Sequence, residues 1–132
     1  MTLVVDASVL VSALIDSGEQ GQWCEAMIVS GDLFAPDLLL PECLNVLRRL
    51  EGGDGAMKPL TAAAVRELAQ LDITLVSVAP LIPEVWALRH NYTSYDASYI
   101  ALAKVLQAPL ATLDQRMASR GDVCEFLLPG SG

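Results

Sequence analysis

Four acidic side chains stand where they could act together, and their chemistry points to a metal-assisted reaction. They are Asp6, Glu42, Asp96 and Asp114. Carboxylates brought close to one another repel, and a divalent cation relieves that repulsion. Oxygen ligands without histidine or cysteine favour the hard cations Mg²⁺ and Mn²⁺. A cation in such a site activates water and holds a phosphodiester for in-line attack, so the predicted chemistry is phosphodiester hydrolysis.

The elements expected around these acids bring three of them to one edge of a sheet. Asp6 follows the apolar run Leu3–Val5, and Asp114 follows the apolar run Leu110–Leu113. Asp96 lies in the first turn of a later helix. In open α/β sheets, ligands bind at the carboxyl ends of parallel strands. We therefore expect Asp6 and Asp114 on that edge, with Asp96 within reach of it.

Apolar runs alternate with segments of helical periodicity along the whole chain. The expected strands are Leu3–Val5, Leu33–Ala35, Thr74–Val78, Leu110–Leu113 and Val123–Phe126. The expected helices span residues 7–15, 23–29, 37–50, 61–71, 82–89, 94–106 and 114–120. Asp37 and Thr61 are expected to cap the helices that they begin. Continuous apolar strands between helices are typical of an α/β fold whose parallel sheet is covered on both faces. We expect one domain over residues 1–128 and a flexible tail at 129–132.

Each acid also has an ordinary structural explanation. Asp is a favoured helix N-cap and suits the positive end of the helix dipole, which fits Asp6, Asp96 and Asp114 taken singly. Glu42 falls at the border of an apolar helix stripe, where a glutamate is usually solvated, although it could lean over the sheet edge. The helix after Asp96 is apolar nearly all round and is expected to be buried, which would leave that carboxylate in need of a partner. It is the joint placement of the acids that favours a site over capping.

Charge and composition limit the partners. The chain has 132 residues, with 8 Lys and Arg against 16 Asp and Glu, and so a net charge of −8. A chain this acidic cannot hold nucleic acid by its overall charge, so a polyanionic substrate would need a local basic patch or bound cations. Hydrophobic residues make up 53% of the chain, which argues against disorder.

The cysteines and the N-terminus indicate a compartment. Cys24, Cys43 and Cys124 form no CxxC pair, and His90 is the single histidine. A zinc ribbon, a disulfide framework and a histidine-based acid–base pair are therefore not expected. The cysteines are interpreted as small buried apolar residues in a reducing compartment, the cytoplasm. A secretory signal and an apolar run long enough to span a bilayer are both absent from the pattern, so no membrane partner is expected.

The four acids lie in segments whose sequences, taken together, match a known pattern. These are VVDASVL (4–10), PDLLLPECLNVLRR (36–49), YDASYIALA (95–103) and ATLDQRM (111–117). In order and spacing they resemble the PIN-domain ribonucleases, and within these the VapC-type toxins of toxin–antitoxin pairs. Some members carry a further acid soon after the position of Asp114, where this chain has Gln115, Arg116 and Met117. A second metal is therefore expected to bind weakly or only with substrate.

The resemblance implies a fold, an activity and partners. The implied fold is a three-layer α/β/α sandwich with a central, mainly parallel sheet. The implied activity is an Mg²⁺- or Mn²⁺-dependent endoribonuclease acting on RNA, in a homodimer that a small antitoxin protein blocks or distorts. The four acids would then be catalytic metal ligands, and Glu42 would either bind metal or orient the attacking water. Ser8 and Thr112 could hydrogen-bond the carboxylates, or they could serve capping and strand packing alone.

Several further residues could contact RNA. Arg116 could touch a phosphate, and the pair Arg48 and Arg49 could form part of an RNA track, although such side chains are often only solvated. Tyr95 could stack on a base, whereas Tyr99 is expected in the core.

Three alternatives remain open at the level of sequence. A receiver-like signalling domain has an acidic pocket on a similar sheet, but it pairs early adjacent acids and a late strand-end Lys, whereas Asp6 stands alone and Lys104 lies within a helix. A phosphohydrolase with an Asp nucleophile uses Asp-x-Asp, where this chain has Asp6-Ala7-Ser8. A catalytically inactive binding module of the same family is the third.

Overall fold

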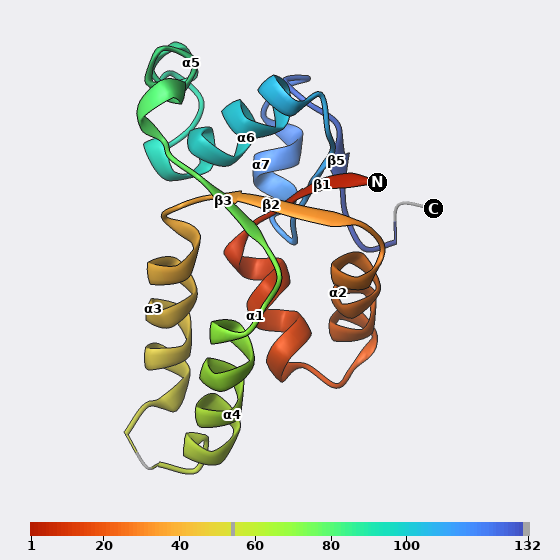
Figure 1. Ribbon diagram of the computed structural model, residues 1–132, viewed down its shortest axis with the longest axis vertical. Coiled ribbons are helices and arrows are strands. Elements are labelled where there is room, and N and C mark those ends of the chain that lie inside the picture. Colours follow the sequence, from red (N-terminus) through yellow and green to blue (C-terminus); the bar gives the residue numbers. More distant parts are fainter. Residues whose placement is uncertain (54, 131–132) are drawn as a thin grey trace.

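A sheet of parallel strands forms the centre of the molecule (Figure 1). The computed structural model describes residues 1–53 and 55–130, so residues 131–132 of the predicted tail lie outside the described part. The strands are β1 (Thr2–Val5), β2 (Asp32–Pro36), β3 (Thr74–Val76), β4 (Leu110–Ala111) and β5 (Phe126–Leu127). The helices are α1 (Ala7–Ile15), α2 (Glu19–Val29), α3 (Leu39–Glu51), α4 (Lys58–Ala69), α5 (Ile82–Ala87), α6 (Ser94–Leu106) and α7 (Gln115–Ser119), with a 3-10 turn η1 (Ala79–Leu81) before α5.

The strand order places the first strand at the centre of the sheet. The order is β3-β2-β1-β4-β5, and every neighbouring pair is parallel. Helices α1 to α4 cover one face of the sheet, and α5 and α6 lie on the other (Figure 1). The predicted α/β/α arrangement with a parallel sheet is therefore confirmed. All strands end at the same edge, where the chain passes from β1 into α1 and from β4 toward α7.

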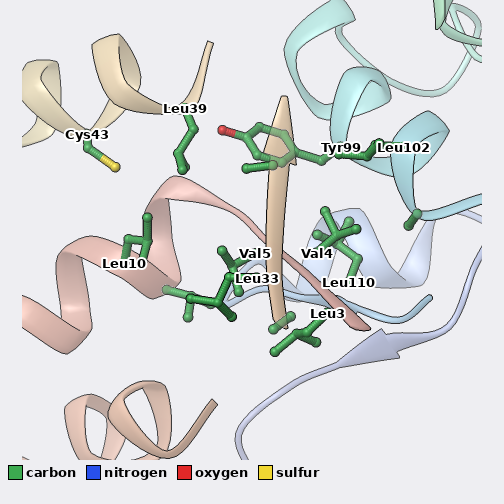
Figure 2. Packing of buried hydrophobic residues seen from close by; sticks show 14 of the residues in the cluster. Leu3, Val4, Val5, Leu10, Leu33, Leu39, Cys43, Tyr99, Leu102 and Leu110 are labelled. Atoms are coloured by element: carbon green, nitrogen blue, oxygen red, sulfur yellow. The ribbon is translucent and has the colours of Figure 1, made fainter. Parts of the chain in front are cut away.

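The core forms between the central strand and the apolar helix α6. Leu3, Val4 and Val5 are completely buried, as their continuous apolar run predicts. Ile100 and Leu102 of α6 belong to the same buried core, and Figure 2 shows Leu110 of β4 next to Val4 of β1. The prediction that this helix is buried is confirmed for residues 97–103, whereas Tyr95 and Val105 near its ends are exposed. Among the described residues, no helix combines the length and apolar character that crossing a bilayer requires.

Two predicted helix caps are wrong. The backbone N–H of Asp37 donates to the carbonyl of Val76 on β3, at 2.9 Å, so Asp37 extends the sheet and α3 begins two residues later without a side-chain cap. Thr61 lies inside α4 rather than at its start. Its hydroxyl is buried and contacts Glu51 Oε2 at 3.3 Å, which ties α4 to the end of α3. Both residues have the right type for a cap but are used in tertiary contacts.

Other boundaries differ because side chains and close packing intervene. Strand β4 ends at Ala111 rather than Leu113, since the N–H of Leu113 donates to Ser8 Oγ at 3.1 Å instead of to a neighbouring strand. Helix α2 begins at Glu19, one turn before the predicted start, and includes Gly21. A Cβ atom at Gly21 would lie 1.8 Å from the carbonyl oxygen of Asp16, so only glycine lets α2 pack this closely against the end of α1.

Candidate active site at the carboxyl edge of the sheet

The register of two central strands brings together residues that are far apart in sequence. Val5 of β1 pairs with Ala111 of β4, so the next residues, Asp6 and Thr112, leave the sheet side by side. The Thr112 hydroxyl donates to Asp6 Oδ2 at 2.5 Å and accepts from the N–H of Asp114 at 3.0 Å. This hydroxyl therefore joins the first acidic segment to the fourth.

Asp6 is the most firmly held carboxylate of the group. It is 7% exposed, and its Oδ1 accepts from Ser8 Oγ at 2.6 Å and from the N–H of Val9 at 3.2 Å. Asp6 is thus the N-cap of α1 and also part of the acidic edge, so a capping role and a place among the acids are compatible at this residue. Burial raises the pKa of Asp6, hydrogen bonds from Ser8 and Thr112 oppose that rise, and the charge of Asp96 adds to it.

Glu42 reaches the same edge from α3 and is held by a tyrosine. Tyr99 of α6 is buried, and its hydroxyl donates to Glu42 Oε1 at 2.5 Å. In Figure 2 the Tyr99 hydroxyl points toward α3. Burial raises the pKa of Glu42, the Tyr99 hydrogen bond opposes the rise, and the charges of Asp6 and Asp96 contribute to it. Tyr99 lies in the core as expected, but its hydrogen bond to the site was not foreseen, and nothing local in the sequence signals it.

Asp96 and Asp114 stand at the starts of two helices. Asp96 lies in the first turn of α6, where Thr93 Oγ1 is the cap and accepts from the Asp96 N–H at 3.2 Å. The Asp96 carboxylate is therefore not the cap that its position suggested. Burial raises its pKa, the charge of Asp114 raises it further, and the guanidinium of Arg120 lowers it. Asp114 is the N-cap of α7, and its Oδ1 accepts from the Met117 N–H at 3.1 Å.

All four acids line one small cavity. The cavity has a volume of about 180 Å³ and is bordered by Asp6, Ala7, Ser8, Glu42, Asp96, Tyr99, Asp114 and Met117. The charged groups in its wall are carboxylates, and neither histidine nor cysteine lines it. Such oxygen ligands suit a hard divalent cation. Over residues 1–53 and 55–130, however, no three His, Cys, Asp or Glu side chains form a group that could hold a metal ion. The acids share a cavity without forming a preassembled ligand shell.

The basic residues near the acidic cavity differ from those that the sequence suggested. Arg116 is exposed on α7 and does not line the cavity. Arg120, which sequence reasoning did not single out, is near enough to lower the pKa of Asp96, and its Nη1 donates to the Asn91 carbonyl at 3.3 Å.

Comparison with known proteins identifies the family. The PIN domain family matches residues 3–123 of the chain. Ribonuclease VapC1 of Mycobacterium tuberculosis is 38% identical over 127 residues, which cover 95% of this chain and 96% of that protein. Two crystal structures share the fold. VapC20 of M. tuberculosis, a sarcin–ricin loop cleaving toxin, has a TM-score of 0.66 at 20% identity and covers 90% of this chain and 95% of its own. VapBC2 of Rickettsia felis, solved with a DNA fragment of its promoter, has a TM-score of 0.69 at 12% identity and covers 97% and 98%.

The family match spans the strands and helices that carry all four acids, and the relative covers almost the whole of both chains. The resemblance read from the four sequence segments is thereby confirmed. This chain belongs to the PIN domain family, in the group of the VapC ribonucleases.

Proposed function

We propose that this protein is a metal-dependent endoribonuclease that acts as the toxin of a toxin–antitoxin pair. One observation carries the proposal: carboxylates from four separate segments of a PIN-domain chain line a single cavity. The name of VapC1 describes a ribonuclease, and the description of VapC20 specifies cleavage of the sarcin–ricin loop. RNA cleavage is extended to this chain, without a particular RNA.

Mg²⁺ or Mn²⁺ is the proposed cofactor, and the acids of the cavity would hold it: Asp6, Glu42, Asp96 and Asp114. When bound, the cation would supply positive charge that activates water and stabilises the charge developing on the phosphate. The fit rests on the donor chemistry, since the cavity presents four carboxylates and neither histidine nor cysteine. Because the described residues contain no ready-made ligand group, the side chains would have to draw together on binding.

The hydrogen bonds that hold each acid indicate its proposed role. Asp6, with hydrogen bonds to both oxygens, provides a fixed position for the rest of the site. Glu42 is held at Oε1 by Tyr99, which leaves Oε2 to bind metal or to orient the attacking water. Its raised pKa suits a group that takes a proton from that water. Arg116 is proposed to contact a phosphate from outside the cavity.

The proposal also includes a small antitoxin protein as partner, a homodimeric state and a cytoplasmic location. The VapBC2 structure supports the existence of a partner for this fold. Large apolar side chains at the surface support a dimer, since Ile82, Trp86 and Val105 are 59%, 65% and 60% exposed on the contacting helices α5 and α6. All three cysteines are free, which supports a reducing compartment.

The test compares Asp6→Asn and Asp96→Asn with the wild type in an RNA cleavage assay with and without Mg²⁺ or Mn²⁺. Asp72→Asn is the matched control, because Asp72 is exposed and borders a different cavity at the opposite end of the sheet. We expect each site variant to lose about 100-fold or more in rate, in line with the loss of one strong electrostatic group, and the control to retain full activity. Calorimetric titration with either metal should show weaker binding for both site variants.

Cleavage that continues normally in either site variant would contradict the proposal. RNA binding without cleavage by the wild type would favour the catalytically inactive alternative. Covalent labelling by a small phosphodonor would favour the receiver-like one.

A further inference from the structure

A second cavity opens directly beside the acidic one. It has a volume of about 460 Å³, within the range of about 300–1,000 Å³ typical of sites for small ligands. It shares the lining residues Ala7 and Glu42 with the acidic cavity, so the two cavities are adjacent. We call it the α3 groove; its other lining residues are Leu38, Pro41, Asn45, Val46, Arg49 and Tyr95.

Polar groups follow one face of α3 away from the acidic cavity. Glu42, Asn45 and Arg49 are three and four residues apart, which places them in a row on the helix surface. The helix rise puts Arg49 about 10 Å along the axis from Glu42. A phosphate bound by Arg49 would therefore belong to a neighbouring nucleotide rather than to the bond at the acids. Arg48 Nε donates to Asn45 Oδ1 at 3.4 Å, which leaves the Asn45 amide hydrogens to donate to a ligand.

The opposite wall of the groove offers an aromatic face. Tyr95 is 64% exposed and directly precedes Asp96 in the first turn of α6. An exposed aromatic ring suits stacking on an unpaired base, whereas a duplex keeps its bases stacked on one another. Leu38 and Val46 provide apolar surface in the same groove.

The positive charge in the α3 groove favours a polyanion as its ligand. The chain has 8 Lys and Arg and a net charge of −8, so the basic residues beside the acids decide where a polyanion can approach. Among the lining residues of these two adjacent cavities, as far as the structure describes the chain, Arg49 is the one cation. A strand of RNA that leaves the acidic cavity toward α3 would meet this cation within the lining, whereas Arg116 and Arg120 lie outside the lining on the α7 side.

We propose that the α3 groove binds the nucleotide next to the cleaved bond in single-stranded RNA, with Tyr95 stacking on its base, Arg49 contacting its phosphate and Asn45 donating to its base edge. The inference rests on the proposed function. It adds to that function the direction in which the RNA leaves the acidic cavity and the surface that would determine specificity.

The test uses Tyr95→Ala and Arg49→Gln with a fluorophore- and quencher-labelled single-stranded RNA of random sequence. Tyr95→Phe retains the ring, and Arg66→Gln removes an exposed arginine of α4 that does not line the groove. We expect Tyr95→Ala to raise KM about tenfold, the size of one lost stacking contact, with kcat within about twofold of the wild type. Tyr95→Phe and Arg66→Gln should retain the wild-type KM.

Salt dependence separates a phosphate contact from a structural effect. For single strands, each neutralised phosphate contributes about 0.7 to the slope of log affinity against log salt concentration. Arg49→Gln should lower that slope by about this amount, and Arg66→Gln should leave it unchanged. An unchanged slope and KM in Arg49→Gln, or an unchanged KM in Tyr95→Ala, would overturn the inference.

A binding arm keeps the two proposals distinguishable. The Asp96→Asn background, in which cleavage is expected to be lost, allows the Kd for the same RNA to be measured by fluorescence anisotropy. If the wild type cleaves no RNA but Tyr95→Ala and Arg49→Gln still weaken binding about tenfold, the proposed function fails and the groove assignment stands. If the groove variants leave RNA binding unchanged and weaken binding of the cognate antitoxin instead, the groove is a protein site and the inference is wrong.

Discussion

The hydroxyl of Tyr99 donates a 2.5 Å hydrogen bond to Oε1 of Glu42 and thereby joins α6 to α3 beside the acidic cavity. The two residues are 57 positions apart in sequence. Tyr99 is 2% exposed, so the contact is fixed by core packing and the glutamate at the surface is positioned from within. Removing this hydroxyl should therefore alter the chemistry of Glu42 without altering the surface that a substrate meets.

Tyr99→Phe is expected to reduce kcat about fivefold to tenfold, because one hydrogen bond to a charged group contributes about 1.5–3 kcal/mol and part of it is replaced by water. KM should change little. Tyr92→Phe is the matched control, since Tyr92 is also buried and its hydroxyl donates to the Met117 carbonyl at 3.2 Å rather than to an acid. Steady-state cleavage kinetics check both variants. An equal fall of kcat in Tyr92→Phe would show that Tyr99 acts only by stabilising the fold.

Thr112 provides a second test, because its buried hydroxyl serves both Asp6 and Asp114. Thr112→Val keeps the shape and loses both hydrogen bonds, so we expect it to destabilise the fold by about 1–3 kcal/mol and to lower the cleavage rate. Thr112→Ser keeps the hydroxyl and loses a methyl group, at a cost of about 1 kcal/mol. Urea unfolding measures the stabilities. The rate should fall in Thr112→Val and be largely retained in Thr112→Ser; equal rates in the two would argue against a positioning role.

The metal-free protein should become more stable as the pH falls. Burial first, and then neighbouring charge, raises the pKa of Asp96 above its ordinary value of 3.8 and that of Glu42 above 4.5. A carboxyl group with a higher pKa in the folded chain binds more protons when folded, so its stabilising contribution is present at low pH and is lost as the pH rises through the raised pKa.

Asp96→Asn removes one of these groups. At pH 7 without metal we expect this variant to have the higher Tm, by about 4 °C for each kcal/mol that is gained when the buried, repelled charge is removed, and the difference should shrink toward pH 4. Added Mg²⁺ should raise the Tm of the wild type more than that of the variant. Differential scanning calorimetry across this pH range checks both statements. A Tm difference that does not change with pH would show that neither burial nor neighbouring charge raises the pKa of Asp96 in the metal-free protein.

Gly21→Ala tests the close approach of α2 to the end of α1. The added Cβ would lie 1.8 Å from the Asp16 carbonyl oxygen, so the helices must move apart, and we expect a loss of about 1–3 kcal/mol in the free energy of unfolding. Gly53→Ala is the control, since a Cβ there meets nothing within 4 Å. Urea denaturation measures both. If Gly21→Ala unfolds at the same urea concentration as the control, this contact does not constrain the packing of α2.

Local patterns predicted the parts of the fold that depend on local physics. The apolar run at β1 and the helix α1 after it appear at their predicted positions, because burial and periodicity both act over a few residues. Asp6 and Asp114 cap α1 and α7 as their residue type favours. The parallel sheet also followed from the pattern, since continuous apolar strands between helices allow few other arrangements.

Contacts between distant segments could not be read in the same way. Asp37 and Thr61 carry the signature of helix caps, yet one extends the sheet and the other joins two helices. The partnership of Tyr99 with Glu42 depends on how α3 and α6 approach one another, which no local spacing encodes. The positions of the acids along the sequence identified them, whereas the side chains that hold them are seen only in the fold.

The distance along the chain between Asp6 and Thr112 sets the moment at which the acidic cavity can exist. Their hydrogen bond closes a separation of 106 residues, because β4 is made long after β1. A ribosome must therefore synthesise almost the entire polypeptide before the first acid meets its last partner. A product truncated before residue 112 would lack both Thr112 and Asp114, so it could not complete the acidic cavity.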